Sequence, residues 1–264
     1  MPAPVTRTGK PLPCATEDRR VRTSDGVTIV YTLWRRPSRE ILVLAPGFWR
    51  VRRAKENLYL ATHFVRRGYD VAAIDFRGHG ESGGAYTFGP RETQDFLAVV
   101  EDLVGEGKPY SRFAVLGLSL GGSIAAEAVA RHPQPPCRAL ALISSPAHVS
   151  ALRPRPWKPG AARQVRLRHV LRMPRIAGRR LLAPKPRIAR ALAQLTIPKL
   201  IVTAEGDWLV DPSHGRILAR AAAPPVDHVH LDLPGSLHAD ALVRYVPLSL
   251  LRLLDRWFGR NAPP

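Results

Sequence analysis

The stretch Gly117-Leu118-Ser119-Leu120-Gly121 has the residue types and spacing that acyl-transfer chemistry requires. An apolar run with strand propensity ends at Ser119, and a run that favours a helix follows it, which predicts a tight strand-to-helix turn. Such a turn lifts the hydroxyl above the sheet and points the N–H of Leu120 and the helix N-terminus at any anion that forms there. The pattern predicts Ser119 as a nucleophile and the Leu120 N–H as an oxyanion donor.

A serine hydroxyl is a weak nucleophile at neutral pH, so Ser119 requires a histidine as general base. The chain has nine histidines. In a parallel sheet the chemistry lies at the carboxyl ends of the strands, and His238 follows the last expected strand, at the same rim as Ser119. His79 shares this rim, but it precedes the serine in a glycine-rich turn and is interpreted as structural. We therefore predict His238 as the base.

The acid that orients the base is found by elimination. It should follow a strand near the rim, and residues 128–204 contain no Asp or Glu. Glu205 comes immediately after a strand and is expected to point away, while Asp211 already has a role as a helix N-cap. Asp207 is therefore the predicted acid, with Asp211 second and Asp232 a weaker alternative.

A second oxyanion donor is expected from the loop Pro46-Gly47-Phe48-Trp49, which follows an early apolar strand. Gly47 permits the backbone to turn toward the serine, which would place the N–H of Phe48 beside that of Leu120. The alternative interpretation is a simple glycine turn.

The elements that would position these residues alternate between strands and helices. A hairpin is expected first, from strand-like runs at 20–23 and 27–34 joined by Asp25-Gly26. Apolar runs predict strands at 41–45, 71–75, 113–117, 139–143, 199–203 and 226–231. Helices are expected at 54–67, 90–103 and 120–131, from Asp211-Pro212 onward, and at 239–258 with Gly259 as the stop. Apolar runs separated by helices indicate an α/β fold, with a mostly parallel sheet covered on both faces.

This alternation divides the chain into three parts. Residues 1–17 are rich in proline and are expected to form a flexible N-terminal arm. Residues 18–146 and 196–264 carry the strand-helix rhythm and are expected to form the core. Between them, residues 147–195 form a basic, proline-punctuated insertion with short helical pieces.

A further motif links these residues to a known family. Residues 75–82, DFRGHGES, are similar to the D-x-R-G-x-G-x-S turn of the α/β-hydrolase superfamily, whose order of serine, acid and histidine this chain also follows. The resemblance extends from Val21 to Phe258 and is to the branch of esterases, monoacylglycerol lipases and serine aminopeptidases. It implies a serine hydrolase with a catalytic triad and an oxyanion hole, and it implies no metal or cofactor. One departure is Pro46-Gly47, where these hydrolases usually carry His-Gly.

The insertion occupies the position where this family places its lid, which shapes the acyl pocket and excludes water. It is also strongly basic, in a chain whose formal net charge is +19. Two interpretations remain open: the insertion packs on the core as a solvated cap, or its arginines face an anionic membrane surface or another polyanion. The arginines are Arg166, Arg168, Arg172, Arg175, Arg179 and Arg180, and the apolar side would hold Val165, Leu167, Val170, Leu171 and Ile176.

Composition limits the other classes of function. A chain of 264 residues with 45% hydrophobic content is long enough for one large globular domain. No apolar run predicts a membrane span and the N-terminus does not resemble a signal peptide, so a cytoplasmic location is expected. Cys14 and Cys137 are too few for a disulfide framework. Trp157 is the one aromatic residue of the basic stretch 128–204, so specific nucleic-acid binding is not expected.

These observations predict a serine hydrolase of the carboxylesterase or lipase class, which cleaves small-molecule carboxylic esters through an acyl-enzyme. The same triad would serve an acyltransferase, a thioesterase or a peptidase. A hydrolase scaffold with an idle triad would instead serve as a non-catalytic basic binding module. Turnover, and the acceptor of the acyl group, distinguish these alternatives.

Overall fold

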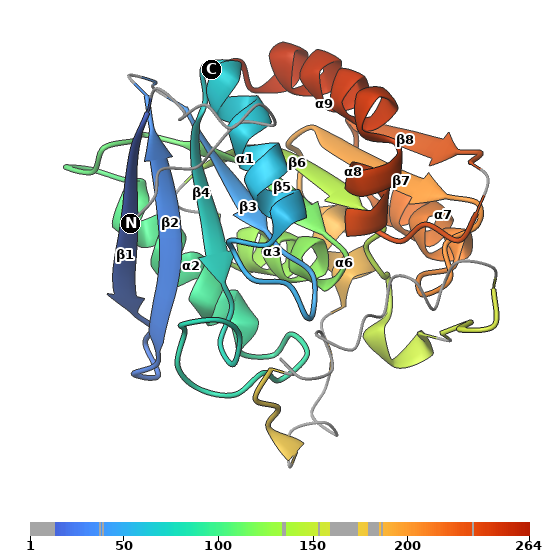
Figure 1. Ribbon diagram of the computed structural model, residues 1–264, viewed down its shortest axis with the longest axis horizontal. Helices are drawn as coiled ribbons and strands as arrows, with labels where there is room; N and C mark the ends of the chain where they lie inside the picture. Colours follow the sequence, from blue (N-terminus) through green and yellow to red (C-terminus); the bar gives the residue numbers. More distant parts are fainter. Residues whose placement is uncertain are drawn as a thin grey trace.

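The strands of the chain form one mixed sheet with helices on both faces (Figure 1). The computed structural model describes residues 14–36, 38, 40–133, 136–152, 154–158, 174–178, 185, 187–233 and 235–264. Within these residues the strands are β1 (Ala15–Arg22), β2 (Thr28–Arg35), β3 (Ile41–Ala45), β4 (Asp70–Asp75), β5 (Phe113–Leu118), β6 (Cys137–Ile143), β7 (Lys199–Ala204) and β8 (Val226–Leu231). Every strand expected from the sequence is present, most with ends shifted by one or two residues.

The eight-stranded sheet of the described chain runs in the order β1-β2-β4-β3-β5-β6-β7-β8. The strands β3 to β8 are parallel to one another, whereas β1 and β2 form an antiparallel hairpin that pairs with β4. The carboxyl ends of β5, β7 and β8 therefore lie at one rim, because parallel strands point the same way. The expected α/β fold with a mostly parallel sheet is confirmed.

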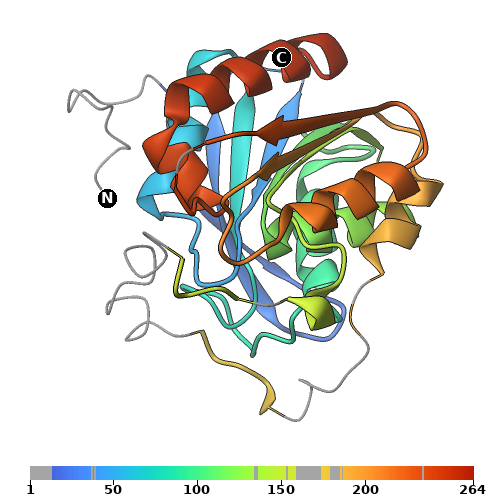
Figure 2. The same ribbon diagram turned by 90° about the vertical axis from the view of Figure 1, so that its right-hand side faces the viewer.

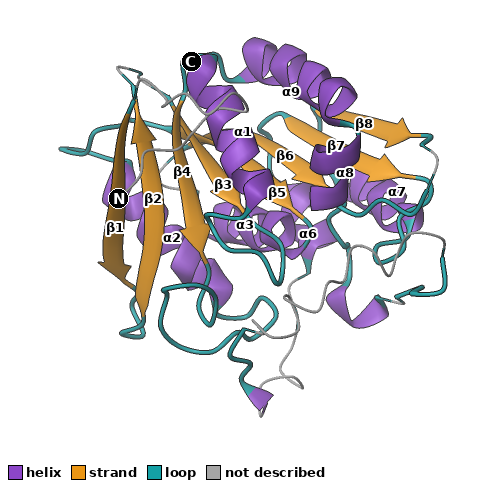
Figure 3. Cartoon of the chain, viewed as in Figure 1, coloured by secondary structure: helices purple, strands orange, loops and turns teal. Residues whose placement is uncertain are grey.

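The helices divide between the two faces of the sheet (Figures 2 and 3). One face carries α1 (Lys55–Arg66), α8 (Asp240–Tyr245) and α9 (Pro247–Asn261), and the other carries α2 (Glu92–Leu103), α3 (Leu120–Arg131), α6 (Ile188–Gln194) and α7 (Pro212–Ala221). None of the helices that the structure describes is long and apolar enough to cross a membrane.

Two hydrophobic cores lie on the opposite faces of the sheet. Every residue of β3, β4 and β5 is buried, as expected for strands covered on both sides. Phe64 and Trp257 pack on one face, while Phe96 and Ile124 pack on the other. Both cores hold β5 and its neighbours in place, so the rim at the carboxyl ends of these strands is a rigid support.

The first and last elements differ from the sequence prediction. The arm expected over residues 1–17 is wrong for residues 15–17, because β1 begins at Ala15 and pairs with β2 as an edge strand whose exposed polar residues hide its pattern. Residues 1–13 lie outside the described part of the chain. The single helix expected over 239–258 is two helices, because Pro247 lacks the N–H that would continue α8. Gly259 lies inside α9 and is not its stop.

The structure describes parts of the expected insertion, namely residues 147–152, 154–158, 174–178, 185 and 187–195. Here α6 buries Ile188 and Leu192 against the core. Arg175, expected among the surface-facing arginines, donates a side-chain hydrogen bond to the carbonyl oxygen of Ser82 in the core. Ile176, expected on the apolar side, forms a β-bridge with Tyr86. The remaining arginines and apolar residues named for this segment lie outside the described residues.

Candidate active site

Ser119 lies on the turn between β5 and α3, in a left-handed conformation with φ 51° and ψ −128°. The flanking glycines are required by packing: a Cβ on Gly121 would overlap the carbonyl oxygens of Ala45 and Pro46, and one on Gly117 would overlap Gly122. The Ser119 N–H donates to the carbonyl of Ile143 at 2.8 Å, which ties the turn to β6. The predicted strand-to-helix turn is therefore present, and it holds the serine in a strained conformation.

A line of hydrogen bonds runs from Ser119 through His238 to Asp207. His238 Nε2 lies 2.9 Å from Ser119 Oγ, and its Nδ1 lies 2.9 Å and 3.0 Å from the two carboxylate oxygens of Asp207. Because a carboxylate only accepts hydrogen bonds, Nδ1 carries the proton and Nε2 is free to accept from the serine hydroxyl. All three residues are at most 7% exposed. The structure thus brings together the three residues that the sequence analysis selected separately.

The environment of His238 balances two opposing effects on its pKa. Burial lowers the pKa, but the charge and hydrogen bond of Asp207 oppose this and the net pKa is raised above its ordinary value. Asp240 adds to the increase and Arg50 counteracts it. These two residues form an ion pair beside His238. The protonated ring is therefore stabilised, as a base that must carry a proton during a reaction requires.

The alternative acids do not contact His238. Asp211 accepts from the Ser213 N–H at the start of α7, as expected for an N-cap, while Glu205 pairs with His230 on β8. Asp232 is exposed. Asp207, in contrast, is 1% exposed and also accepts the N–H groups of Leu209 and Val210 at 2.9 Å each. These bonds fix the carboxylate against the imidazole ring.

The loop after β3 approaches the serine from the other side. A Cβ on Gly47 would lie 3.1 Å from the Cβ of Ser119, so a glycine suits this close approach. Trp49 has a left-handed backbone with φ 67°. Among the described residues, neither the Phe48 N–H nor the Leu120 N–H has a hydrogen-bond acceptor. Both predicted oxyanion donors are thus available to a ligand.

His79 holds this loop, which agrees with its interpretation as a structural residue, although the sequence did not indicate its contact with Trp49. Its Nε2 accepts the Trp49 N–H at 3.2 Å, and its Nδ1 donates to the carbonyl of Arg77 at 3.2 Å. Burial lowers the pKa of His79 to about 4, so the ring is neutral and Nε2 can accept. The edge-on ring contacts Phe48 and Tyr86 at centroid distances of 5.6 Å and 4.8 Å. In the sequence, the one signal for this contact was the expected position of His79 at the same rim as Ser119.

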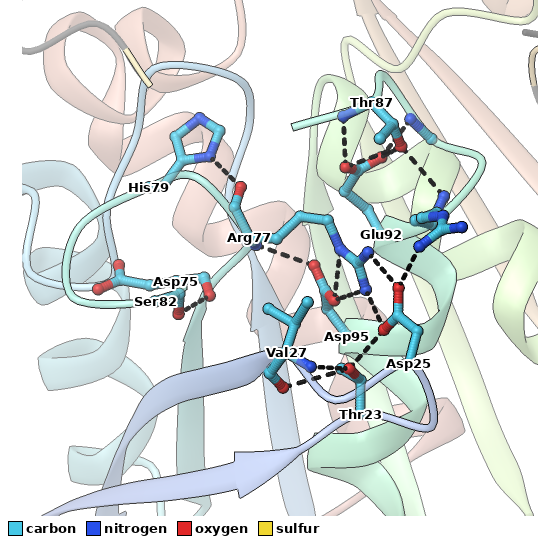
Figure 4. A network of polar contacts seen from close by, with 12 residues as sticks. Thr23, Asp25, Val27, Asp75, Arg77, His79, Ser82, Thr87, Glu92 and Asp95 are labelled. Atoms are coloured by element: carbon cyan, nitrogen blue, oxygen red, sulfur yellow. Dashed lines mark hydrogen bonds and ion pairs between the residues drawn. The ribbon is translucent and has the colours of Figure 1, made fainter. Parts of the chain in front are cut away.

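A buried polar network anchors the turn that carries His79 (Figure 4). Arg77 is 2% exposed, and its guanidinium binds Asp95 of α2 and Asp25 of the β1–β2 turn. The Arg77 N–H also donates to Asp95 at 2.9 Å. Ser82 donates to the carbonyl of Asp75 at the end of β4. These contacts explain the DFRGHGES motif: its arginine, histidine and serine fix the turn to the sheet and to α2.

A cavity of about 520 Å³ opens at Ser119 and His238. Its walls are mostly apolar and come from the loop after β3, the loop before α2, the insertion and the acid loop. The apolar side chains include Phe48, Phe88, Val149, Leu152, Trp208 and Leu209. Arg50 and Asp240 supply a charged pair at its edge. Among the described residues no group of three or more His, Cys, Asp or Glu could hold a metal ion.

The fold, the turn at Ser119 and a matching family model define the chain as a serine hydrolase of the α/β-hydrolase superfamily. A family model described as "Serine aminopeptidase, S33" matches residues 36–175, just over half of the chain. The chain belongs to this family.

Relatives and solved structures agree with this assignment. The chain is 36% identical over 113 residues to the monoacylglycerol lipase of Mycolicibacterium smegmatis, a match that covers 41% of this chain and 39% of the relative. The chain therefore aligns with about two fifths of that protein. The fold is similar to the esterase Pf2001 of Pyrococcus furiosus, with a TM-score of 0.73, 19% identity and coverage of 94% and 93%. It is also similar to a putative aryl esterase of Burkholderia cenocepacia, with a TM-score of 0.67, 17% identity and coverage of 91% and 97%.

Proposed function

We propose that this protein cleaves carboxylic esters with an apolar acyl group, through an acyl-enzyme on Ser119. The observation that carries the proposal is the continuous line from Asp207 through His238 to Ser119 at the floor of an apolar cavity. Acyl transfer requires a nucleophile, a base and hydrogen-bond donors for the oxyanion. Here they are Ser119 with its left-handed backbone, the buried His238 and two available N–H groups.

In the proposed reaction the oxygen of Ser119 attacks the carbonyl carbon while His238 Nε2 takes its proton. The carbonyl oxygen becomes an oxyanion that accepts hydrogen bonds from the N–H groups of Phe48 and Leu120. His238 then gives its proton to the alcohol oxygen, the C–O bond breaks, and the acyl group stays on Ser119. Asp207 holds the Nδ1–H tautomer and stabilises the imidazolium.

A water molecule completes the cycle. His238 takes one proton from the water, and the resulting hydroxide oxygen attacks the acyl carbon of the acyl-enzyme. The oxygen of Ser119 leaves and recovers that proton from His238. The products are the carboxylic acid and the free serine, so the protons balance and no further reactant is needed.

The walls of the cavity favour an ester over a peptide with a free N-terminus. Binding of an ammonium group in an apolar site requires an available carboxylate. Among the described residues that line the cavity, Asp240 is the only carboxylate, and it is paired with Arg50. The monoacylglycerol lipase relative is consistent with an ester of a fatty acid. The apolar walls and the paired charge therefore support an ester as the proposed substrate.

The insertion is proposed as the lid of this cavity. Val149, Leu152 and Pro154 belong to it and line the cavity beside the acyl site. Arg155 fastens the same segment to the acid loop, through a hydrogen bond of 2.7 Å to the carbonyl of Asp207 and an ion pair with Asp211. The segment is thus placed to determine the length of acyl group that enters.

Turnover of p-nitrophenyl esters of increasing acyl length tests this function, with aminoacyl p-nitroanilides as the competing substrates. We expect kcat/KM to rise with acyl length until the cavity is filled, and the anilides to react far more slowly. Leu152→Trp should reduce the rate with the longest esters first, because it narrows the cavity, while Leu248→Trp on the exposed face of α9 is the matched control. Faster cleavage of the anilides would contradict the ester proposal.

A further inference from the structure

A second cavity, of about 550 Å³, lies on the α2, α3 and α6 side of the sheet. It is formed by the start of α2, the end of α3 and the α6 segment, and it shares no residue with the cavity at Ser119. Four cationic side chains line it, namely Arg131, Lys185, Arg187 and Arg190. The reaction proposed at Ser119 makes no use of this cavity.

Positive side chains outnumber negative ones among the described residues that line this cavity. Among the described residues that line it, Glu127 is the only carboxylate, and Glu127 pairs with Arg131 across one turn of α3. Arg187 and Arg190 have no carboxylate partner within the described chain. Like charges that line one cavity repel each other. An anion that enters the cavity is therefore attracted by all of these side chains.

The floor of the cavity supplies a second feature that suits an anion. Gly89, Pro90 and Thr93 bring the start of α2 to it. Thr93 is 7% exposed, and among the described residues its hydroxyl has no hydrogen-bond partner. A hydroxyl that lines a cavity and has no partner within the described chain is a donor available to a ligand. The nearby Glu92 carboxylate accepts the N–H groups of Thr87 and Gly89 and also interacts electrostatically with Lys185.

We propose that this cavity binds the phosphate group of a phosphorylated ligand. Guanidinium groups form paired hydrogen bonds with phosphate oxygens, and Lys185 adds a point charge beside them. The hydroxyl of Thr93 donates to a further oxygen at the floor. The volume exceeds that of one phosphate, so the cavity has room for an organic group attached to the phosphate.

The phosphate site lies directly behind one wall of the cavity at Ser119. Phe88 lines that cavity and its neighbour Gly89 lines the phosphate site. Lys185 donates to the carbonyl of Thr87 at 3.2 Å and lies 5.7 Å from the centre of the Phe88 ring. A phosphate bound beside Lys185 therefore lies next to a side chain that contacts the wall of the cavity at Ser119.

Calorimetric titration of the full chain with glycerol 3-phosphate tests the proposal. We expect saturable binding at millimolar concentration or below, weakened about tenfold or more by the pair Arg187→Gln and Arg190→Gln. Thr93→Val removes one hydroxyl at constant charge and should weaken binding severalfold. The matched control is the pair Arg252→Gln and Arg256→Gln on exposed positions of α9, which removes the same charge and should leave binding unchanged. Absence of binding, or equal weakening by the control pair, would overturn the proposal.

Binding to vesicles distinguishes two sources of the phosphate group, a lipid headgroup and a soluble phosphate ester. If the ligand is a lipid headgroup, vesicles that contain phosphatidic acid should bind the native chain better than neutral vesicles, and glycerol 3-phosphate should compete. If it is a soluble phosphate ester, vesicle binding should be the same for the Arg187/Arg190 variant and the control pair. Vesicle binding without any binding of glycerol 3-phosphate would contradict a phosphate site in this cavity.

Discussion

The two cavities of this protein are similar in size and opposite in chemistry. The cavity at Ser119, of about 520 Å³, is mostly apolar, and the proposed catalytic groups that line it are held by buried hydrogen bonds. The second cavity, of about 550 Å³, is lined by cationic side chains, of which Arg187 and Arg190 are exposed. Volume alone therefore does not distinguish the two cavities. The line of buried, hydrogen-bonded residues is found at only one of them, within the described chain.

The largest expected difference between the cavities comes from Asp207→Asn. The amide would present a donor to Nδ1 and favour the wrong tautomer of His238, so kcat should fall by about four orders of magnitude. Binding of glycerol 3-phosphate to the second cavity should remain unchanged. Asp211→Asn is the matched control, because Asp211 caps α7 without contacting His238. Steady-state kinetics decide the point, and comparable losses in both variants would show that Asp207 has no special role.

His79→Phe should lower kcat by about 10- to 100-fold. The phenyl ring keeps the contacts with Phe48 and Tyr86, but it does not accept the Trp49 N–H, so the oxyanion loop shifts. KM should change less than kcat, because the phenyl ring still packs against Phe48 in the wall of the cavity. His230→Phe on β8 is the control. A rise in KM with unchanged kcat would mean that His79 shapes the pocket and does not position the oxyanion donors.

Gly121→Ala should destabilise the protein by about 1–3 kcal/mol, because the new methyl group overlaps the backbone after β3. The cavity at Ser119 depends on this close packing, whereas the second cavity does not. Gly259→Ala is the opposite control: it meets no atom within 4 Å and lies inside α9, so it should stabilise by roughly 0.5–1 kcal/mol. Urea unfolding measures both, and equal midpoints for the two variants would refute the packing argument.

The smallest expected effect is on the pH dependence of activity. In the proposed mechanism the neutral form of His238 is the base. Because the pKa of His238 is raised, activity should increase with pH through a midpoint above the ordinary value of about 6.5. Asp240→Asn removes one cause of the increase and should move the midpoint down by less than about one pH unit. Asp232→Asn, at an exposed position, should leave it in place. A midpoint that rises in Asp240→Asn would contradict this electrostatic account.

The sequence predicts the parts of the molecule that local chemistry determines. Continuous apolar runs identify β3, β4 and β5, since these strands are buried on both faces, and the paired glycines identify the turn at Ser119. The edge strand β1 begins earlier than expected, because its polar residues resemble a loop. The amphipathic pattern predicted one helix over 239–258. The division into α8 and α9 at Pro247 is visible only in the backbone.

The site was only partly predictable, because some of its contacts join residues that are far apart in the sequence. Asp207 could be chosen because residues 128–204 lack carboxylates, which removed the competing strand end. The hydrogen bond from Trp49 to His79 joins residues 30 positions apart, and no spacing rule connects a glycine-rich turn with an oxyanion loop. The second cavity joins α2, α3 and α6, so its charge is apparent only after the helices are packed.

Labelling by a fluorophosphonate probe tests the central claim most directly, because the probe reacts only with an activated serine. Intact-mass spectrometry should show one adduct on the native protein and on Ser249→Ala, an exposed serine of α9, and none on Ser119→Ala. The adduct should also be lost in His238→Ala, since the hydroxyl then has no base. Equal labelling of native protein and Ser119→Ala, or none on folded native protein, would contradict the proposed role of Ser119.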